Sequence, residues 1–417
     1  MKRGRREFVK SLAGAAVIAP GIAGASRQPE GPTMKTSKTH DVAVIGAGVF
    51  GAWSAYHLQQ AGKSVALIDA YGPSNSRASS GGESRIIRMG YGPNELYTRW
   101  SMRSLELWKE FFQRAGKPLF HRTGVLWMNH EGDQYSLDTL VMLQKVKVPH
   151  QKLSRSELEK AYPQIAFGKV TWGILEPESG ALMARRAVQA VVEEIVRNGG
   201  EYRLGAAAQP KGQKKLAAVT TSNGEIISAG TYVFACGPWL PKVFPDLLQG
   251  RIRPTRQEVF FFGIPPGDTR FSPPAMPVWI DAKDEFYGFP DLESRGFKIA
   301  LDRHGPAHDP DTTSRVVTPE QLREVRELLS QRFPALKDAP VVETRVCQYE
   351  NTSNGDFLID RHPDFDNVWL VGGGSGHGFK HGPALGEYVA RLVTQGGATE
   401  PRFSLATKEK VDARSVF

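Results

Sequence analysis

The alternation of apolar and polar positions is clearest between residues 41 and 69. The segment 41–45, which is apolar after Asp41, and the apolar run at 65–68 have the length and continuity of strands buried on both faces. Between them, an alanine-rich stretch that ends at Gln60 predicts a helix. This order of strand, helix and strand predicts a parallel βαβ unit.

The turn after the first predicted strand carries three glycines, Gly46, Gly48 and Gly51. In a dinucleotide-binding turn, the first glycine permits the tight bend, the second admits the pyrophosphate and the third lets helix and strand pack closely. Asp69 ends the second strand about twenty residues further on, where an acidic side chain holds a ribose hydroxyl. The unit therefore predicts dinucleotide binding, with an ordinary βαβ turn as the alternative, and it leaves the dinucleotide itself open.

A second glycine-rich turn lies near the end of the chain. An apolar strand predicted at 368–371 runs into a turn that contains Gly373 and Gly374, and Pro383 favours a helix start soon afterwards. A helix N-terminus favours negative charge beside it. We therefore expect a redox cofactor whose reduced form is an anion, close to four reactive side chains: Cys347, Tyr349, His377 and Lys380.

The intervening pattern predicts a helix at 183–198 and a strand at 231–235 that returns to the dinucleotide-binding sheet. Alternating segments predict further strands at 201–204, 217–221, 225–229, 253–262, 277–280 and 285–289. Thr318 opens a helix as a capping box with proline in the first turn. Core positions are predicted on this helix and on an earlier aromatic stretch: Leu322, Val325, Leu328, Leu329, Phe333, Trp100, Leu105, Trp108 and Phe112.

Several motifs together resemble one enzyme family, monomeric sarcosine oxidase with N-methyltryptophan oxidase and L-pipecolate oxidase, among the D-amino-acid-oxidase-like flavoenzymes. The resemblance covers residues 41–403 and implies FAD rather than NAD. It rests on these segments: Gly82-Glu-Ser-Arg85-Ile-Ile-Arg88, Tyr287-Gly-Phe-Pro290, Phe297-Lys298, Cys347-Gln-Tyr349, the run at 356–363, and Ser375-Gly-His377-Gly-Phe-Lys380.

The resemblance also implies roles for single residues. Arg88 and Lys380 match a pair that holds a substrate carboxylate, the first by a bidentate fork and the second as a point charge. Lys298 matches the lysine beside flavin N5 that promotes reaction with oxygen, and Arg85 matches an arginine that favours the anionic reduced ring. A surface ion pair for Arg88 and a solvated strand position for Lys298 are the alternatives.

Cys347 matches the cysteine that holds the flavin covalently. The chain has two cysteines, so a disulfide with Cys236 is the alternative, although Cys236 ends an apolar strand and a thiol there packs like a small hydrophobic group. Tyr287, Tyr349 and His377 match aromatic and imidazole groups that line the family's pocket. Ordinary packing with a satisfied hydroxyl is the other interpretation of the tyrosines.

The chain departs from the sarcosine oxidase pattern in two places. Ser80 and Gly81 replace a pair of histidines, which is closer to pipecolate oxidase, and Asp302 replaces a histidine four residues after Lys298. We expect oxidation of a sarcosine-type N-methyl amino acid by oxygen, with a cyclic amino acid such as pipecolate or proline as an alternative. A dehydrogenase serving a respiratory carrier, a nicotinamide dehydrogenase and a non-catalytic flavin-binding protein are the remaining alternatives.

The N-terminal residues predict export. Arg5 and Arg6 precede an uncharged stretch at 11–26 that ends in small residues, the pattern of a twin-arginine signal. We expect residues 1–25 to be a cleaved signal recognised by the twin-arginine machinery, 26–39 to be a linker, and the mature protein to be periplasmic and monomeric without stable membrane insertion. An uncleaved amphipathic tail is the alternative.

The positions of the two glycine-rich turns predict an interleaved α/β fold, in which a Rossmann-like FAD domain alternates with an α+β substrate domain built on an antiparallel sheet. We assign 40–122, 183–245 and 346–417 to the first domain, and 123–182 and 246–345 to the second. The net charge is +9, of which the first 25 residues carry five basic groups and one acid. Without an arginine-rich run or zinc-type spacing, nucleic acid is not an expected partner.

Overall fold

The N-terminal βαβ unit forms the centre of a seven-stranded sheet in the computed structural model, which describes residues 39–410. The predicted signal and all but the last residue of the predicted linker lie outside the described residues. Along the sheet the order is β17-β18-β11-β1-β2-β9, with β10 paired to β11. Pairing is parallel from β18 to β9 and antiparallel for β17 and β10. The bounds are β1 His40–Ile45, β2 Val65–Asp69, β9 Glu201–Leu204, β10 Ala218–Thr220, β11 Ile226–Phe234, β17 Leu358–Arg361 and β18 Val368–Gly372.

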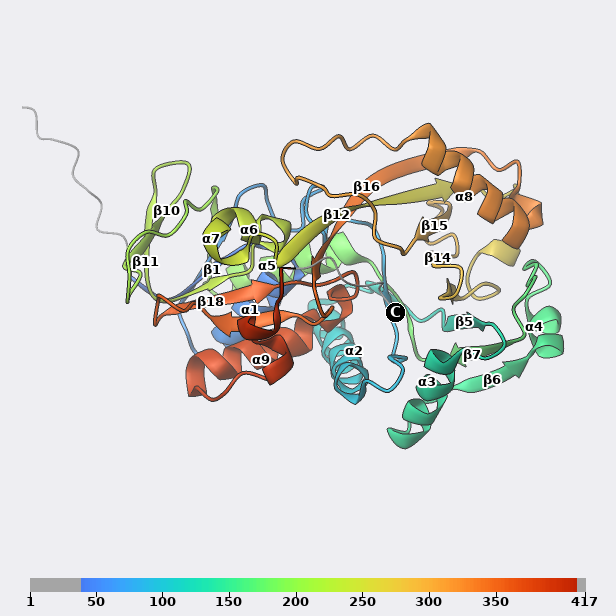
Figure 1. Ribbon diagram of the computed structural model, residues 1–417, viewed down its shortest axis with the longest axis horizontal. Helices are drawn as coiled ribbons and strands as arrows, with labels where there is room; N and C mark the ends of the chain where they lie inside the picture. The colour runs from blue at the N-terminus through green and yellow to red at the C-terminus, as the bar shows by residue number, and fades with distance from the viewer. Residues whose placement is uncertain (1–38, 411–417) are drawn as a thin grey trace, which may run out of the picture. The chain divides into compact units, whose positions relative to one another are not determined.

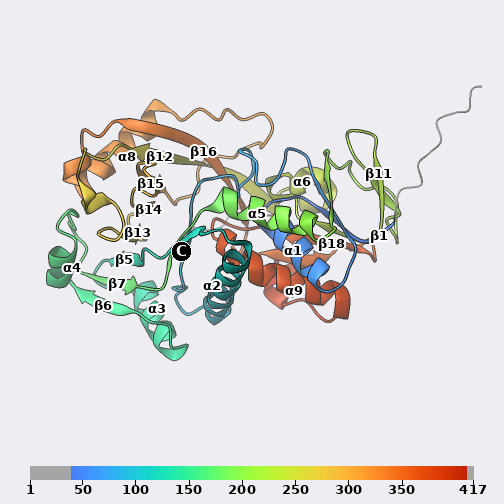
Figure 2. The ribbon, with the colours of Figure 1, turned by 180° about the vertical axis from the view of Figure 1, so that it is seen from behind.

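Helices cover one face of this sheet. Successive side chains of each strand point to opposite faces, so the apolar side chains of the sheet pack into two separate cores. Val42 and Val44 of β1 point into a core shared with Trp53 of α1, whereas Ala43 and Ile45 point into a smaller core on the other face. The covering helices, side by side in Figures 1 and 2, are α1 Val49–Gln60, α2 Glu95–Ala115, α5 Ala184–Arg197 and α9 Gly382–Gln395.

An eight-stranded sheet forms the second half of the fold, in the order β16-β12-β15-β14-β13-β5-β7-β6. All its pairs are antiparallel except β13 with β5. Its helix α8 (Pro319–Arg332) buries Val325 and Leu329 against the sheet. The strand bounds are β5 Val125–Asn129, β6 Gln151–Ser154, β7 Trp172–Glu176, β12 Ile252–Phe262, β13 Val278–Asp281, β14 Phe286–Phe289, β15 Phe297–Leu301 and β16 Val341–Thr352.

A small antiparallel sheet, in the order β3-β8-β4, is formed by segments at which the chain passes from one large sheet to the other. Its strands are β3 Arg85–Ile87, β4 Phe120–His121 and β8 Gly180–Leu182. The remaining helices are α3 Gln134–Lys145, α4 Arg155–Ala161, α6 Leu240–Val243 and α7 Pro245–Leu248, with 3₁₀ turns at Gly237–Trp239, Thr269–Phe271, Pro334–Leu336, Phe379–His381, Pro401–Phe403 and Leu405–Thr407.

The predicted fold class is confirmed, and two local predictions need correction. The strands predicted at 225–229 and 231–235 are one strand, β11, because its first half pairs with β10 and its second half with β1. The helix predicted with Pro383 at its start is confirmed as α9, which begins at Gly382 and carries the proline in its first turn, after the 3₁₀ turn Phe379–His381. The capping box is half formed: the Thr318 side chain accepts a hydrogen bond from the Gln321 N–H (3.3 Å).

The two large sheets follow the predicted interleaving, but the domain boundaries remain a prediction. Strand β16 runs through the expected boundary at 345–346 and pairs along its length with β12. Within residues 39–410, no helix has both the length and the hydrophobicity needed to cross a membrane.

Candidate cofactor and substrate site

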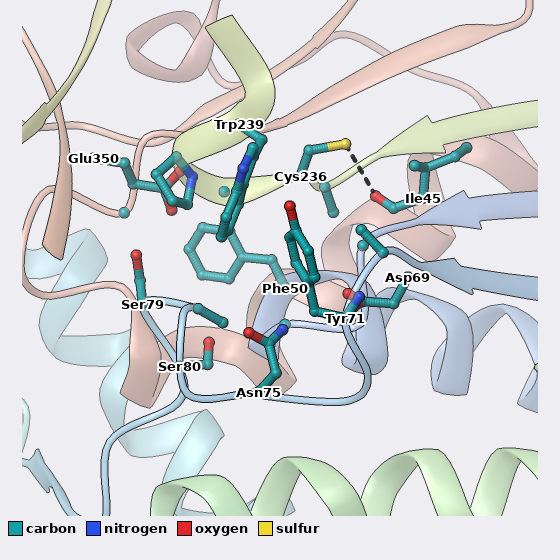
Figure 3. Close-up of a pocket in the computed structure, with 18 of the residues that line it drawn as sticks. Ile45, Phe50, Asp69, Tyr71, Asn75, Ser79, Ser80, Cys236, Trp239 and Glu350 are labelled. Atoms are coloured by element: carbon teal, nitrogen blue, oxygen red, sulfur yellow. Dashed lines mark hydrogen bonds between the residues drawn. The ribbon is translucent and has the colours of Figure 1, made fainter. Parts of the chain in front are cut away.

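A cavity of about 380 Å³ opens at the carboxyl ends of the central parallel strands (Figure 3). Gly48 and Val49 at the N-terminus of α1 line it, together with Asp69 at the end of β2 and Gly374 from the C-terminal turn. This edge of a parallel sheet, with a helix N-terminus facing inwards, is where a nucleotide pyrophosphate binds in Rossmann-like folds. The structure therefore brings both glycine-rich turns to one cavity.

The three N-terminal glycines, Gly46, Gly48 and Gly51, differ in how much space the surrounding protein leaves for a side chain. A Cβ on Gly46, whose φ is +109°, would lie 2.3 Å from the Ala235 carbonyl oxygen, and a Cβ on Gly51 would lie 1.8 Å from the Gly46 carbonyl oxygen. A Cβ on Gly48 would meet the Ser80 Oγ at an ordinary 3.5 Å. Gly46 and Gly51 are thus required by the protein's own packing, and Gly48 leaves the cavity wall open.

Asp69 shapes the turn that follows β2. Its carboxylate accepts hydrogen bonds from the backbone N–H groups of Ala47 (2.7 Å), Tyr71 (2.9 Å) and Gly72 (2.9 Å). Burial raises the pKa of Asp69, and these N–H groups counteract the rise. Its contact with a ribose hydroxyl remains a prediction.

Three buried polar atoms of the cavity wall lack a hydrogen-bond partner among residues 39–410. They are Ser79 Oγ, Gln348 Oε1 and Glu350 Oε2, and all three residues line the cavity. Buried polar groups are normally satisfied, so their presence indicates a polar ligand that supplies the missing bonds. Together with the Gly48 opening and the α1 N-terminus, they fit a bound dinucleotide.

Cys347 and Arg85 meet beside this cavity. Arg85, which lines it, donates to the carbonyls of Ser84 (2.8 Å) and Ser79 (2.6 Å) and lies 3.3 Å from the Cys347 Sγ. Both cysteines are free thiols, so the disulfide alternative is wrong. Cys236 lines the cavity as well, where burial raises the pKa of its thiol.

Lys298 is buried in the middle of the antiparallel sheet rather than solvated. Its Nζ donates to Ser84 O (3.0 Å) and Ser84 Oγ (3.2 Å), and it lies 4.2 Å from the centre of the Phe289 ring. Burial and then the Arg85 charge hold the pKa of Lys298 well below its ordinary value. The amine thus contacts the same segment that positions Arg85.

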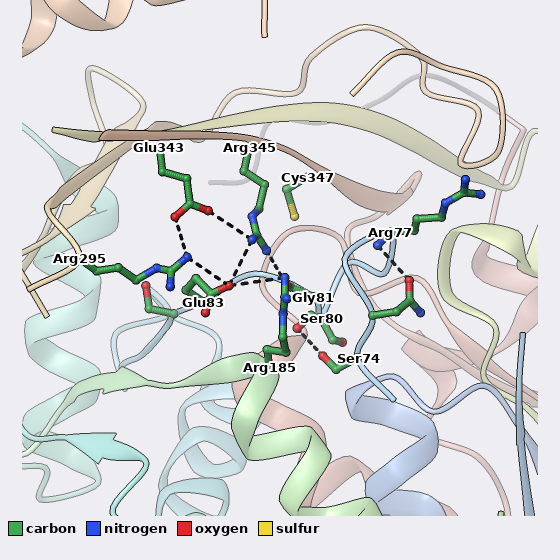
Figure 4. A network of polar contacts seen from close by, with 12 residues as sticks. Ser74, Arg77, Ser80, Gly81, Glu83, Arg185, Arg295, Glu343, Arg345 and Cys347 are labelled. Atoms are coloured by element: carbon green, nitrogen blue, oxygen red, sulfur yellow. Dashed lines mark hydrogen bonds and ion pairs between the residues drawn. The ribbon is translucent and has the colours of Figure 1, made fainter. Parts of the chain in front are cut away.

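The loop that carries Ser79, Ser84 and Arg85 is fixed by a network of charged side chains (Figure 4). Arg185 of α5 and Arg345 of β16 both donate to the Gly81 carbonyl, at 2.7 Å in each case. Glu83 pairs with three arginines, Arg345 (3.2 Å), Arg185 (3.4 Å) and Arg295 (3.6 Å). Elements far apart in the sequence therefore hold this loop in place.

A second cluster gathers two cations around one tyrosine. Lys380 Nζ donates to the Tyr91 hydroxyl (2.8 Å) and the His377 carbonyl (3.0 Å). The Arg88 guanidinium donates to the Gly90 carbonyl and lies between the rings of Tyr91 (4.5 Å) and Trp127 (4.6 Å). Arg88 and Lys380 are each only 5% exposed, so the surface alternative for Arg88 is wrong.

Burial and the neighbouring Arg88 charge hold the pKa of Lys380 well below its ordinary value. Two cations this close in a buried site repel each other unless an anion joins them. The negative charges of Asp302 and Glu176 oppose this repulsion and favour the protonated amine of Lys380.

Tyr349, Tyr287 and Asp302 form a polar group beside these cations. Tyr349 lines the cavity, and its hydroxyl donates to Asp302 Oδ1 (2.8 Å). Burial raises the pKa of Asp302, while the Tyr349 bond and the charges of Arg88 and Lys380 lower it. Burial followed by the Asp302 charge raises the pKa of both tyrosines, so the phenols remain hydrogen-bond donors.

Six of the predicted site residues line the cavity, namely Gly46, Gly48, Asp69, Arg85, Tyr349 and Gly374, whereas Gly51, Arg88, Tyr287, Lys298, Cys347, Gly373, His377 and Lys380 do not. The His377 ring is buried between Tyr91 and Phe357, with its Nε2 3.0 Å from the Gly355 carbonyl. Gly373 has a φ of +68°, and a Cβ there would lie 2.6 Å from a methyl carbon of Thr352. Both support the turn that Gly374 presents to the cavity.

Several residues of the site were missed by the sequence analysis. Tyr91 joins the two cations, Glu176 holds the backbone at Met89 and Gly90, and Ser80 caps the first N–H of α1 at Val49. Each acts through contacts between segments that are distant in the sequence, so no local spacing marks it. Glu350 follows Tyr349 directly and could have been suspected from that position alone.

Comparison with known proteins agrees with this geometry. The family model described as "FAD dependent oxidoreductase" (DAO) matches residues 41–392. The chain is 31% identical to peroxisomal sarcosine oxidase from Homo sapiens over 84% of this chain and 91% of that protein. It is 29% identical to monomeric sarcosine oxidase from Arthrobacter sp. over 87% and 94% of the two chains.

A solved structure of L-proline dehydrogenase from P. horikoshii superposes with a TM-score of 0.76 at 24% identity, covering 88% of this chain and 97% of that one, and shows the same fold. Bound FAD supplies a two-electron acceptor. The residues that would hold it are those of the cavity wall, from the α1 N-terminus to Arg85. The chain belongs, with these sarcosine oxidases, to the DAO family of FAD-dependent oxidoreductases.

Proposed function

We propose that the protein oxidises an amino acid that carries a secondary amine, a sarcosine-type N-methyl amino acid, and passes the electrons to oxygen. The substrate loses a hydride from its α-carbon and a proton from its amine and becomes an imine. Oxygen takes up the two electrons and two protons to give hydrogen peroxide. The names of the related sarcosine oxidases support this substrate class.

The observation that carries the proposal is the buried pair Arg88 and Lys380 around Tyr91. A carboxylate placed between them would receive a guanidinium fork and an ammonium charge in a site with little water. Its α-carbon would then lie on the side of Tyr349 and the cofactor cavity. Simple amines would lack this anchor.

The position of Asp302 supports the proposal that the substrate is an amino acid with a free, basic amine. Its carboxylate stands near the two cations and accepts the Tyr349 hydroxyl, so it can receive an N–H from a substrate whose carboxylate is held by Arg88 and Lys380. Because its pKa is raised, it can also take the amine proton, which leaves the neutral amine that hydride loss requires.

An anaerobic screen tests the substrate class directly. The purified holoenzyme is mixed with sarcosine, other N-methyl amino acids, pipecolate, proline, primary amino acids and amines without a carboxylate, and the loss of flavin absorbance is recorded. We expect N-methyl amino acids to bleach the flavin fastest and amines without a carboxylate slowest. Equal rates for both classes would contradict the proposal, and faster bleaching by pipecolate or proline would favour the cyclic alternative.

We also propose that Cys347 holds FAD covalently through a thioether to its C8 methyl carbon. Its thiol lies 3.3 Å from Arg85, a residue that lines the cavity. The new C–S bond replaces the S–H bond and one methyl C–H bond, and the two released electrons pass through the flavin to oxygen.

For the covalent link, we expect acid precipitation to leave yellow colour in the pellet of the unmutated protein. Cys347→Ser should release the colour into the supernatant, since serine cannot form the thioether, whereas Cys236→Ser should retain it in the pellet. Colour found wholly in the supernatant from the unmutated protein would show that the link is absent.

We further propose export by the twin-arginine route, supported by Arg5, Arg6 and the following uncharged stretch at 11–26. Replacing both arginines by lysine should leave an uncleaved precursor in the cytoplasm of the native host, because the machinery reads the arginine pair. N-terminal sequencing of each cell fraction checks this. A mature protein that still begins at Met1 in every fraction would refute cleavage.

A further inference from the structure

Glu350 stands in the cavity wall without a role in substrate binding or oxygen chemistry. Its side chain lines the cavity and is 7% exposed, and Oε2 is fully buried with no hydrogen-bond partner. Within residues 39–410 it forms no ion pair. Figure 3 shows it on the opposite side of the cavity from Asp69, with Phe50 between them.

The surrounding backbone leaves room for this carboxyl group. A Cβ on Gly374 would lie 3.2 Å from its Oε1, and a Cβ on Gly372 or Gly237 would lie 3.6 or 3.8 Å from its Oε2. Three glycines from two different segments therefore enclose the carboxyl closely. Such an enclosure fixes where Oε2 points.

The charge of Glu350 is costly in this place. Burial raises its pKa to about 7, and the N–H groups of Gly374 and Gly373 counteract the rise only in part. The titratable group that faces it from the segment before the 3₁₀ turn is Cys236, whose pKa burial also raises. The other charged side chains of the cavity wall are Arg85, Lys242, Asp69 and Asp311. Near neutral pH the carboxyl can therefore keep its proton and act as a donor.

The position of Glu350 indicates which part of the cofactor it meets. The pyrophosphate belongs at the α1 N-terminus near Gly48, and the flavin ring belongs beside Arg85 and Cys347. The hydroxyl-bearing chain of FAD joins these two ends. We propose that Glu350 is a cofactor-binding residue whose protonated carboxyl group donates a hydrogen bond from Oε2 to this polyol chain.

This assignment makes FAD binding dependent on pH. If the protonated form binds, the bound cofactor raises the pKa of Glu350 further, because ionisation would break the bond and oppose the pyrophosphate charge. FAD affinity should then be constant below pH 7, the pKa before binding, and fall above it by up to about tenfold per pH unit. The inference uses the family's cofactor and is independent of the substrate.

The dissociation constant of FAD across pH 5.5–9 (about three units around neutrality) tests this. Apoprotein is prepared from the Cys347→Ser variant, so that binding is reversible, and titrated with FAD by the quenching of flavin fluorescence. We expect the affinity to fall above pH 7 in this parent. Adding Glu350→Gln, whose amide keeps a donor but cannot ionise, should remove the pH dependence.

A control variant and an infrared measurement test whether the pH dependence comes from Glu350. Adding Cys236→Ala instead should leave the pH dependence intact, since the thiol stays neutral in this range. Infrared difference spectra of the parent with and without FAD should show the carbonyl band of a protonated carboxyl above neutral pH, and this readout needs no Glu350 variant. A pH-independent affinity in the parent, a dependence that survives Glu350→Gln, or no protonated carboxyl in the complex would overturn the proposal.

Discussion

Replacing Lys298 by methionine should slow the reaction of the reduced enzyme with oxygen by about 10²- to 10³-fold, the cost of losing one preorganised charge at a site of developing charge. The amine is buried and held by Ser84, in the loop that carries Arg85. Methionine keeps the length and apolar contacts of the chain with Phe289 but removes the charge. Stopped-flow measurement of both half-reactions should show a much smaller effect on reduction by substrate.

The pH dependence of the oxygen reaction provides a second readout for Lys298. Because burial and Arg85 lower its pKa, the cation is lost as pH rises through that pKa. The rate with oxygen should therefore fall at higher pH in the unmutated enzyme and be independent of this group in the methionine variant. Lys283→Met, at an exposed position between β13 and β14, is the matched control and should leave both half-reactions unchanged. Equal losses in the two half-reactions of Lys298→Met would refute the assigned role.

Arg88→Gln and Lys380→Ala should each weaken the binding of amino acid substrates by about 10- to 100-fold. The loss of one charge-assisted hydrogen bond costs about 1.5–3 kcal/mol, which corresponds to that change in affinity. Binding of amines without a carboxylate should change far less. Dissociation constants from the substrate dependence of anaerobic bleaching separate this effect from the chemical step.

The double variant and an exposed control sharpen the carboxylate test. If both cations hold the same carboxylate, their losses should not add, because each single change already disturbs the shared anion. Arg99→Gln, on the exposed side of α2, should bind every substrate as the unmutated enzyme does. Unchanged binding of amino acids in both single variants would show that the carboxylate is held elsewhere.

Much of the fold follows from local pattern. The β1–α1–β2 unit was predictable because residues 42–45 and 65–68 of its strands are buried on two faces and are therefore apolar. The division of 225–235 into two strands was wrong, since the Gly230 break looks like a turn when pairing with β1 and β10 is unknown. The pairing of β11 with β1 and β10 makes residues 226–234 one strand, and no local sequence pattern predicts this pairing.

In the candidate site, too, some features follow from local motifs and others only from contacts across the fold. Cys347, Lys298 and Lys380 lie in recognisable motifs, but their burial and partners depend on contacts across the fold. Lysine in a strand is ordinarily exposed, so the strand position alone indicates a solvated Lys298 and only the resemblance placed it in the site; the packing of β15 between β12 and β14 buries it. The arginine network around Glu83 has no sequence signature at all.

The central claim, an oxidase that hands electrons from a secondary-amine amino acid to oxygen, is tested most directly by one two-step measurement. The holoenzyme is bleached anaerobically with a limiting amount of its best N-methyl amino acid, and air-saturated buffer is then added while absorbance and hydrogen peroxide are recorded. We predict rapid return of the flavin absorbance and as much peroxide as substrate oxidised. A flavin that stays bleached in oxygen and recovers only with an artificial electron acceptor would contradict the claim and identify a dehydrogenase.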